Sequence, residues 1–166
     1  KQFEELDDIS IDMYIEMVEK KTGALLGACL FLPAVISRKS NNEIEKIKNI
    51  GRQLGIAFQI QDDLLEIFED EKKMGKSLGS DIFSNKKTAI AIEAKNLNKT
   101  EWDNLICQFD GTNLDNIRSF LIRNKIKEKV ETLAERYFNL AYNELSKLGF
   151  DNDSEIFKIF KMIQER

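Results

Sequence analysis

The sequence contains no histidine among its 166 residues, and this absence excludes several kinds of active site. Histidine-dependent catalytic triads, zinc sites with histidine ligands and proton transfer by an imidazole all require that side chain. Catalysis by this chain must therefore use carboxylates, lysines, hydroxyls, amides or a bound ion. Carboxylate chemistry assisted by a metal ion is the class that this composition favours.

Cysteine and proline are also scarce. The two cysteines, Cys29 and Cys107, lie 78 positions apart and form neither a CxxC redox pair nor a zinc-binding cluster. We therefore expect a reducing, cytoplasmic compartment. The one proline, Pro33, falls within the longest apolar stretch, residues 24–36, and we expect it to bend or break a helix there.

No apolar run is long enough to cross a membrane. The stretch at residues 24–36 has 13 residues, whereas a transmembrane helix needs about 20. We therefore expect no membrane span. The sequence begins with Lys1 rather than methionine, and no apolar run near it has the features of a signal peptide. We expect the natural N-terminus to lie upstream of Lys1.

The charge balance gives no general attraction for nucleic acid. The 25 basic residues are scattered among 29 acidic ones, which leaves a net charge of −4 and a pI near 5.1. Any anion-binding site must therefore be local. With 33% charged and 42% hydrophobic residues, the composition is typical of a globular protein with a substantial core.

Apolar residues recur at intervals of three and four nearly throughout, which predicts an all-α chain of about six or seven helices. We expect helices to begin after Ser10, near Asn42, near Lys87, at Thr100, near Ile126 and after Ser154. The residues expected to face the core are Tyr14, Met17, Leu25, Leu54, Phe58, Leu65, Ala141 and Leu145. No repeat or linker divides the chain, so we expect residues 1–166 to form a single unit.

The carboxylates before the loop-like segment at residues 69–81 are the strongest candidates for chemistry. Asp62 and Glu66 lie one helical turn apart on one face, about 6 Å from each other, where like charges repel unless a cation lies between them. With Asp63 they could hold Mg²⁺, which prefers oxygen ligands and often completes its shell with water and substrate phosphates. A solvated acidic helix end is the alternative.

The helix before this motif carries Gly51 and Gly55 on the same face as Asp62. Close helix packing is favoured over contact with a ligand as the interpretation of the two glycines, each of which costs about 1 kcal/mol relative to alanine in mid-helix. Gln59 has an amide that could bind a carboxylate or a ligand oxygen. A surface position is an equally good interpretation of that glutamine.

Lysines flank the motif and could bind a phosphate. Lys76, Lys86 and Lys87 lie on or beside the glycine-containing loop, and an ammonium group is a suitable partner for a diphosphate. Lys21 lies on the apolar stripe of the first helix and is followed by Thr22. The alternatives are solvated lysines, a Lys21 chain that reaches the surface, and a threonine bonded to its own helix backbone.

Three segments together resemble the trans-isoprenyl diphosphate synthases of the farnesyl and geranylgeranyl type. They read KTGALLGA at residues 21–28, FQIQDDLLE at 58–66 and GKSLGSDIFSNKKT at 75–88. Their order and spacing match that family, and residues 137–145 and the closing KIFKMIQER also fit it. The resemblance implies a helical isoprenoid synthase bundle that joins an allylic diphosphate to isopentenyl diphosphate with loss of diphosphate. It also implies three Mg²⁺ ions between two aspartate-rich motifs.

The resemblance also implies the metal ligands. Asp62 matches the aspartate of the second motif that binds magnesium, and Asp63 and Glu66 complete that motif by direct or water-mediated contact. The family usually has aspartate where this chain has Glu66, so direct coordination by that residue is an open point. Asp81 is expected to order the glycine-containing loop in which it lies.

The same resemblance assigns the remaining site residues. Lys21 and Lys76 match lysines that grip the allylic diphosphate, and Lys86 matches a further lysine of the diphosphate pocket. Thr22 and Gln59 match polar groups near the reacting carbon. The implied catalytic residues are thus Lys21, Thr22, Gln59 and Asp62.

Nothing in residues 1–60 resembles the first aspartate-rich motif, the arginine pair or the isopentenyl diphosphate site of that family, and Asp7 and Asp8 lack the pattern. The resemblance therefore implies the C-terminal half of a synthase, which needs its N-terminal half and is expected to form a homodimer. The parent would make products of C15 to C20 or longer, with the length set by residues absent here. A noncatalytic synthase-like subunit of a heteromeric prenyltransferase is the alternative. In either case we expect an exposed apolar surface.

Overall fold

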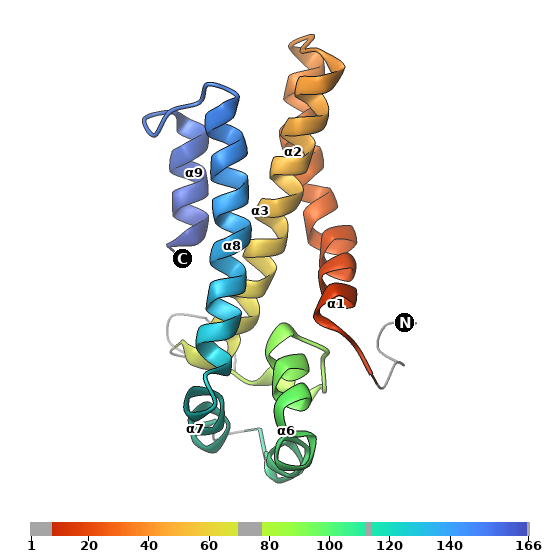
Figure 1. The fold of residues 1–166 in the computed structure, drawn as a ribbon, viewed down its shortest axis with the longest axis vertical. Helices are drawn as coiled ribbons and strands as arrows, with labels where there is room; N and C mark the ends of the chain where they lie inside the picture. Colours follow the sequence, from red (N-terminus) through yellow and green to blue (C-terminus); the bar gives the residue numbers. More distant parts are fainter. Residues whose placement is uncertain (1–7, 70–77, 112–113, 166) are drawn as a thin grey trace. The chain divides into compact units, whose positions relative to one another are not determined.

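The computed structural model of this chain describes residues 8–69, 78–111 and 114–165, in which the regular secondary structure is helical and includes no β-strand (Figure 1). The elements are α1 (Ile11–Val18), the π-helical turn η1 (Glu19–Gly23), α2 (Ala24–Ile36), α3 (Asn41–Phe68), α5 (Ser80–Phe83), α6 (Ala89–Gln108), α7 (Asp115–Arg123), α8 (Ile126–Lys147) and α9 (Glu155–Gln164). The fold class predicted from apolar periodicity is confirmed.

The chain divides into two compact units. Unit 1 comprises the described parts of residues 1–14 and 60–132, and unit 2 comprises those of residues 15–59 and 133–166. Helices α1, α3 and α8 each contribute residues to both units. The expectation that residues 1–166 form a single unit stays a prediction.

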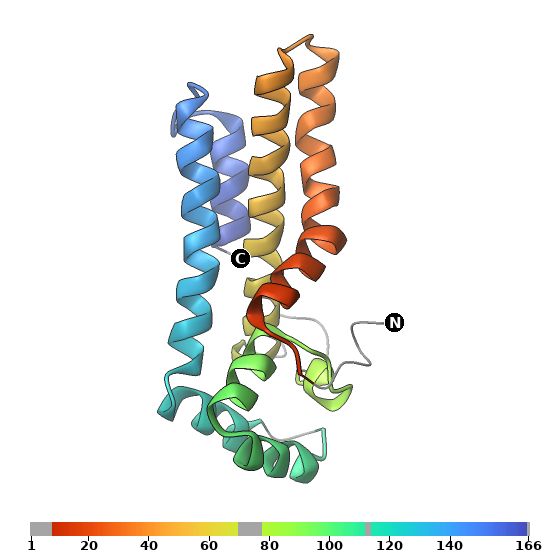
Figure 2. The ribbon, with the colours of Figure 1, turned by 45° about the vertical axis from the view of Figure 1, so that its right-hand side comes forward.

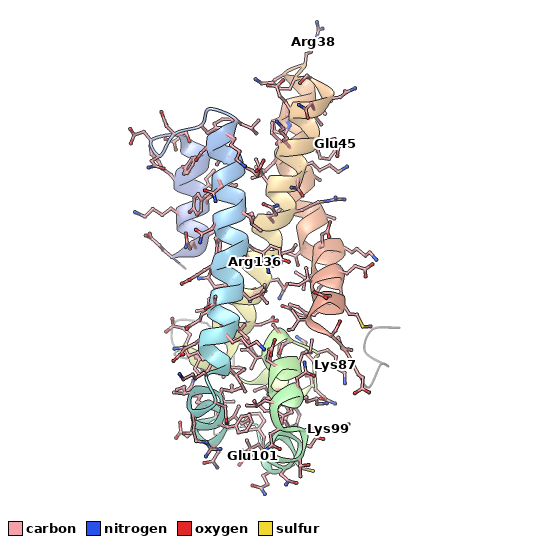
Figure 3. The ribbon with its side chains drawn as sticks, viewed as in Figure 1. Arg38, Glu45, Lys87, Lys99, Glu101 and Arg136 are labelled. Atoms are coloured by element: carbon pink, nitrogen blue, oxygen red, sulfur yellow. The ribbon has the colours of Figure 1, made fainter. Side chains whose placement is uncertain are left out.

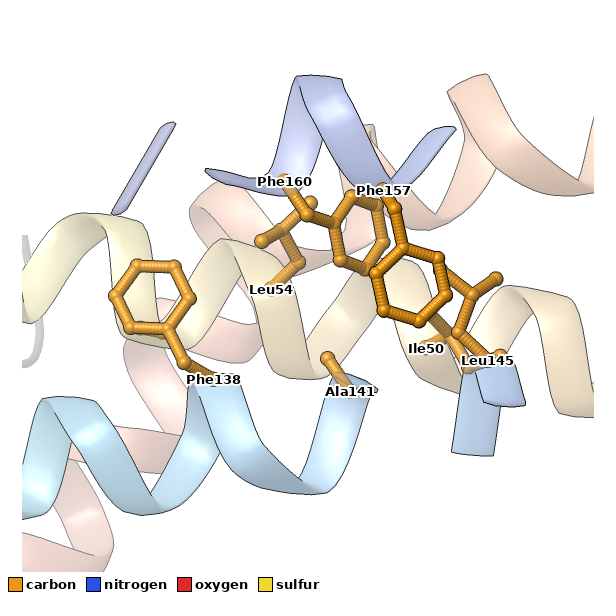
Figure 4. Close-up of a cluster of buried hydrophobic side chains, with 8 residues drawn as sticks. Ile50, Leu54, Phe138, Ala141, Leu145, Phe157 and Phe160 are labelled. Carbon is orange, nitrogen blue, oxygen red and sulfur yellow. The ribbon is translucent and has the colours of Figure 1, made fainter. Parts of the chain in front are cut away.

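The core of unit 2 joins α3, α8 and α9 (Figure 4). The buried side chains of this core are Ile50, Leu54, Ala57, Phe138, Ala141, Leu145, Phe157 and Phe160. Tyr142 of α8 packs against two rings of α9. Its ring centroid lies 5.4 Å from that of Phe157 and 5.8 Å from that of Phe160. A helix of ten residues is marginal in water by itself, so α9 depends on these contacts.

Glycines bring η1 and α2 against α3 in unit 2. A Cβ atom added to Gly55 would lie 2.5 Å from the Cα atom of Gly23, and one added to Gly51 would lie 2.7 Å from the Cα atom of Gly27. Since each contact is with backbone, a side chain at either α3 position would push the helices apart. The interpretation of Gly51 and Gly55 as helix-packing residues is confirmed.

Helix α2 departs from two predictions. Pro33 does not break the helix, which continues to Ile36, because the loss of the one hydrogen bond that the proline cannot donate is outweighed by the rest of the helix; whether the helix bends there stays a prediction. Leu25 is 66% exposed rather than buried. Apolar residues occupy nearly every side of α2, and only its glycine-bearing side packs against α3, so other apolar side chains remain exposed. Besides Leu25, the large exposed apolar residues of α2 are Leu32, Val35 and Ile36, which fits the expected exposed apolar surface.

Helix α6 in unit 1 changes direction at Asn98, whose φ of −152° and ψ of 85° are not helical (Figure 2). The Asn98 side chain accepts a hydrogen bond from the Glu101 amide at 3.2 Å and donates one to the Glu101 carboxylate at 3.0 Å. The sequence predicted two helices here with Thr100 as the second cap. Asn98 takes that role instead, because its side-chain oxygen reaches the amide three residues later.

Arg118 of α7 secures the C-terminal end of α3, also within unit 1. Its Nε atom donates to the Ile67 carbonyl at 2.6 Å, and a terminal nitrogen donates to the Glu69 carbonyl at 3.2 Å. The last carbonyls of a helix have no partner within it, so a charged donor stabilises them. The end of α3 that carries the acidic motif is thereby held in place.

Both cysteines are exposed and neither is part of a disulfide. Across the parts of the chain that the structure describes, the helices lack the combination of length and apolar character that crossing a bilayer requires.

Candidate functional site

The three carboxylates of the acidic motif lie on the last two turns of α3 and have different surroundings. Asp63 is 5% exposed and Glu66 is 1% exposed, whereas Asp62 is half-buried. A buried carboxylate must be hydrogen-bonded to remain charged. The fold therefore separates one accessible carboxylate from two that are held inside unit 1.

Asp63 is held by Tyr14 of α1. The Tyr14 hydroxyl donates a hydrogen bond of 2.6 Å to Oδ2 of Asp63, and the tyrosine is 1% exposed. Burial raises the pKa of Tyr14 well above its usual value, and the charge and hydrogen bond of Asp63 raise it further. The hydroxyl thus stays protonated and remains a donor that orients the Asp63 carboxylate. Sequence reasoning assigned Tyr14 only to the core, because no short motif links two residues so far apart.

Glu66 is held by the turn that begins α5. Its Oε1 atom accepts a hydrogen bond of 2.6 Å from the Ser80 hydroxyl and one of 3.3 Å from the Asp81 amide. The Gly79 amide also donates to the Glu66 carbonyl at 3.2 Å. Glu66 thus connects α3 to the segment that follows the motif. No sequence signal pointed to Ser80, whose contribution comes from the return of the chain to α3.

The loop lysine Lys86 is paired with an aspartate. Lys86 forms an ion pair with Asp81, and their side chains are 57% and 17% exposed. The backbone amide of Asp81 also donates a hydrogen bond to the Glu66 carboxylate, so Asp81 contacts both Glu66 and Lys86. Lys76 lies outside the described residues.

The remaining site residues belong to unit 2. Lys21 and Thr22 lie in η1, a type of turn that is rare overall and frequent at functional sites. The Thr22 hydroxyl donates a hydrogen bond of 3.0 Å to Oε1 of Gln59, so two residues predicted from separate motifs are in contact. The close approach of Gly23 to Gly55 brings the two backbones near enough for this bond. Lys21 is exposed.

The acidic motif suits a hard cation that takes few protein ligands. Within residues 8–69, 78–111 and 114–165, no three acidic or cysteine side chains form a metal-binding group. Magnesium is commonly bound through one or two carboxylates, with water and phosphate oxygens completing its shell. Half-buried Asp62, beside an Asp63 carboxylate oriented by Tyr14, fits that requirement.

Comparison with known sequences assigns the chain to a family. The profile of the polyprenyl synthetase family matches residues 1–121. The geranylgeranyl diphosphate synthase of Sulfolobus acidocaldarius is 31% identical over 157 residues, which cover 92% of this chain and 48% of that protein. The short chain isoprenyl diphosphate synthase of Methanocaldococcus jannaschii is 38% identical over 125 residues, which cover 75% of this chain and 36% of that protein.

Solved structures are similar over nearly the whole chain. A crystal structure of a geranylgeranyl pyrophosphate synthase has a TM-score of 0.88 and 27% identity, and the match covers 99% of this chain and 54% of that one. The geranylgeranyl pyrophosphate synthetase of the archaeon Geoglobus acetivorans has a TM-score of 0.78 and 30% identity. That match covers 99% of this chain and 50% of the Geoglobus chain. The chain thus spans about half the length of these synthases. It belongs to the polyprenyl synthetase family.

Proposed function

We propose that this chain carries the second aspartate-rich motif of a magnesium-dependent prenyltransferase. The complete enzyme would condense an allylic diphosphate with isopentenyl diphosphate and release diphosphate. The names of the similar proteins, geranylgeranyl and short chain isoprenyl diphosphate synthases, support this reaction class. The observation that carries the proposal is the sorting of the motif into accessible Asp62 and buried Asp63 and Glu66.

The acidic motif would bind the metal that faces the leaving group. Mg²⁺ supplies positive charge that stabilises a departing diphosphate. Asp62 would be a direct ligand, and Asp63 and Glu66 would contribute through fixed orientation or water. Since Tyr14 and Ser80 already hold the two buried carboxylates, little rearrangement would be needed when charge develops.

The lysines, together with Thr22 and Gln59, would act on the substrate. Lys21, Lys76 and Lys86 would bind diphosphate oxygens as point charges. Thr22 donates its hydroxyl hydrogen to Gln59, so its oxygen can present only lone pairs to a reacting carbon. The negative ends of such dipoles stabilise a carbocation without a proton-transfer step.

The complete enzyme would need both halves and would act as a homodimer. One acidic motif supplies too few ligands to clamp a magnesium diphosphate complex from two sides. The natural full-length protein, given Mg²⁺, an allylic diphosphate and labelled isopentenyl diphosphate, should therefore incorporate label. The 166-residue chain alone should not, and addition of the N-terminal half in trans should restore turnover.

Two results would contradict this proposal. Incorporation of label by the isolated chain would show that the N-terminal half is not required. No incorporation by the full-length protein, despite normal folding, would contradict the enzymatic function and favour the accessory-subunit alternative.

A further inference from the structure

Unit 1 contains a pocket of about 380 Å³ bordered by residues 8–13 and 85–99. These segments precede and begin α1 on one side, and lead into and form the first part of α6 on the other. The pocket is within the size range of small-molecule sites. Its lining does not include the acidic motif on α3.

The pocket is positively charged in an acidic protein. Four of its lining residues are lysines, namely Lys86, Lys87, Lys95 and Lys99, and the one acidic lining residue is Asp8. Asp81 and Asp103, which lie outside the lining, offset Lys86 and Lys95, so the pocket keeps a small positive excess from Lys87 and Lys99 in a chain whose net charge is −4. Such a local excess of ammonium groups selects for an anion.

Two of these lysines have no acidic partner in the described part of the chain. Lys86 pairs with Asp81 and Lys95 lies 4.0 Å from Asp103, but Lys87 and Lys99 form no ion pair with a described residue. Figure 3 shows Lys87 and Lys99 on the same side of unit 1, one at each end of the first part of α6. Their charges are thus available to a ligand in the pocket.

Part of the pocket wall is apolar, beside polar residues such as Ser10, Asn85 and Asn96. Ile9 and Ile92 are 8% and 3% exposed, and Met13 and Ala91 contribute further apolar surface. A ligand that matches both features has a negatively charged head and a short apolar part. Lysine ammonium groups are good partners for phosphate oxygens.

We propose that this pocket binds a small phosphorylated organic anion through Lys87, Lys95 and Lys99, with its apolar part against Ile9, Met13 and Ile92. The proposal does not depend on the prenyltransferase function, since only Lys86 is shared with the proposed diphosphate site. The small pocket and the acidic net charge of the chain do not suit a polynucleotide.

Calorimetric titration of the full-length protein with n-butyl phosphate tests the proposal. EDTA is present so that the acidic motif cannot hold the anion through a metal. We expect saturable binding that weakens at least about tenfold in K87Q/K99Q, because two charge-assisted contacts are lost. The variant K46Q/K125Q removes the same charge at exposed positions outside the pocket and should bind normally.

A second variant tests the apolar wall. M13S should weaken binding of n-butyl phosphate by at least about threefold and leave binding of inorganic phosphate unchanged, since only the former buries methylene groups. The variant D62N should bind n-butyl phosphate normally. Absence of binding, equal binding by K87Q/K99Q and the natural protein, or equal weakening in K46Q/K125Q would overturn the proposal. Because prenyl transfer is assayed separately, failure of one proposal does not imply failure of the other.

Discussion

The Tyr14 hydroxyl and the Asp63 carboxylate, 49 positions apart, form a hydrogen bond of 2.6 Å inside unit 1. Asp63 is the middle residue of an acidic motif, yet it is nearly inaccessible to solvent. The bond satisfies a buried charge and restricts the direction in which the carboxylate points. Its removal should therefore affect stability and metal binding together.

Tyr14→Phe should lower the free energy of unfolding by about 1 to 3 kcal/mol, because Asp63 loses a donor in a buried site. The change should also alter alkaline unfolding. The pKa of Tyr14 lies well above 10.0 in the folded state, so its stabilising effect is present below pH 10 and is lost as pH rises further. Chemical denaturation between pH 8 and 11 should show a shallower decline for the variant.

Tyr142→Phe is the matched control for the loss of stability at neutral pH, whereas burial and the charge of Glu165 also raise the pKa of Tyr142 and make it unsuitable as a control for the alkaline decline. Tyr142 is half-buried, and its ring packs against the rings of Phe157 and Phe160. It should lose much less stability than Tyr14→Phe. Equal losses in the two variants would contradict a special role for the hydroxyl of Tyr14.

Gly55→Ala should separate η1 from α3 in unit 2. The new Cβ atom would meet the Gly23 backbone at 2.5 Å, whereas one at Gly27 meets its nearest atom, the Lys48 carbonyl oxygen, at 3.1 Å. Both changes gain about 1 kcal/mol of helix propensity, so they differ mainly in the clash. We expect Gly55→Ala to cost at least about 2 kcal/mol more than Gly27→Ala in thermal or denaturant unfolding. Similar costs would show that the helices can move apart freely.

Asp62→Ala should affect metal binding and catalysis far more than Glu66→Gln in the full-length enzyme. We expect kcat/KM to fall at least about 100-fold for Asp62→Ala and no more than about tenfold for Glu66→Gln. The glutamine retains an oxygen that can accept from Ser80, whereas Glu66→Ala should lower Tm because the bond to Ser80 is lost. Magnesium titration by calorimetry should give the same order of affinities. Equal losses for Asp62→Ala and Glu66→Gln would contradict the division of roles.

Ser40→Ala should weaken the start of α3. The Ser40 hydroxyl accepts a hydrogen bond from the Glu43 amide at 3.3 Å, and the Glu43 carboxylate accepts one from the Ser40 amide at 3.0 Å. This reciprocal arrangement is a capping box, and its loss costs about 0.5 to 2 kcal/mol. Denaturant unfolding measures that loss, with Ser37→Ala, a substitution before the helix, as the control.

Glu43 also makes the stability of this helix end depend on pH. The hydrogen bonds from Ser40, and then Lys39, lower the pKa of Glu43 from 4.5 to about 2. A lowered folded-state pKa contributes stability that is present above pH 4.5 and is lost as pH falls towards 2. Glu43→Gln should therefore lose less stability over that interval. Identical acid transitions in the two proteins would contradict this assignment.

The helical class and the position of the acidic motif could be read from sequence because both depend on local pattern. Apolar spacing of three and four residues, a serine before α1 and glycine after α8 act within a few positions along the chain. The same is true of the spacing that puts Asp62 and Glu66 on one face of a helix. Leu25 was misassigned because α2 is apolar on most sides, and periodicity cannot identify the side that packs.

The sequence by itself determined the helices, the family and the residue types available for chemistry, since these depend on local spacing and on motif content. The tertiary structure alone decided which carboxylate is accessible, because Asp63 and Glu66 accept hydrogen bonds from Tyr14 and Ser80, which lie outside their own stretch of the sequence. It likewise decided the contact between Thr22 and Gln59. Burial and hydrogen-bond partners arise only when distant segments pack together, and no local pattern contains them.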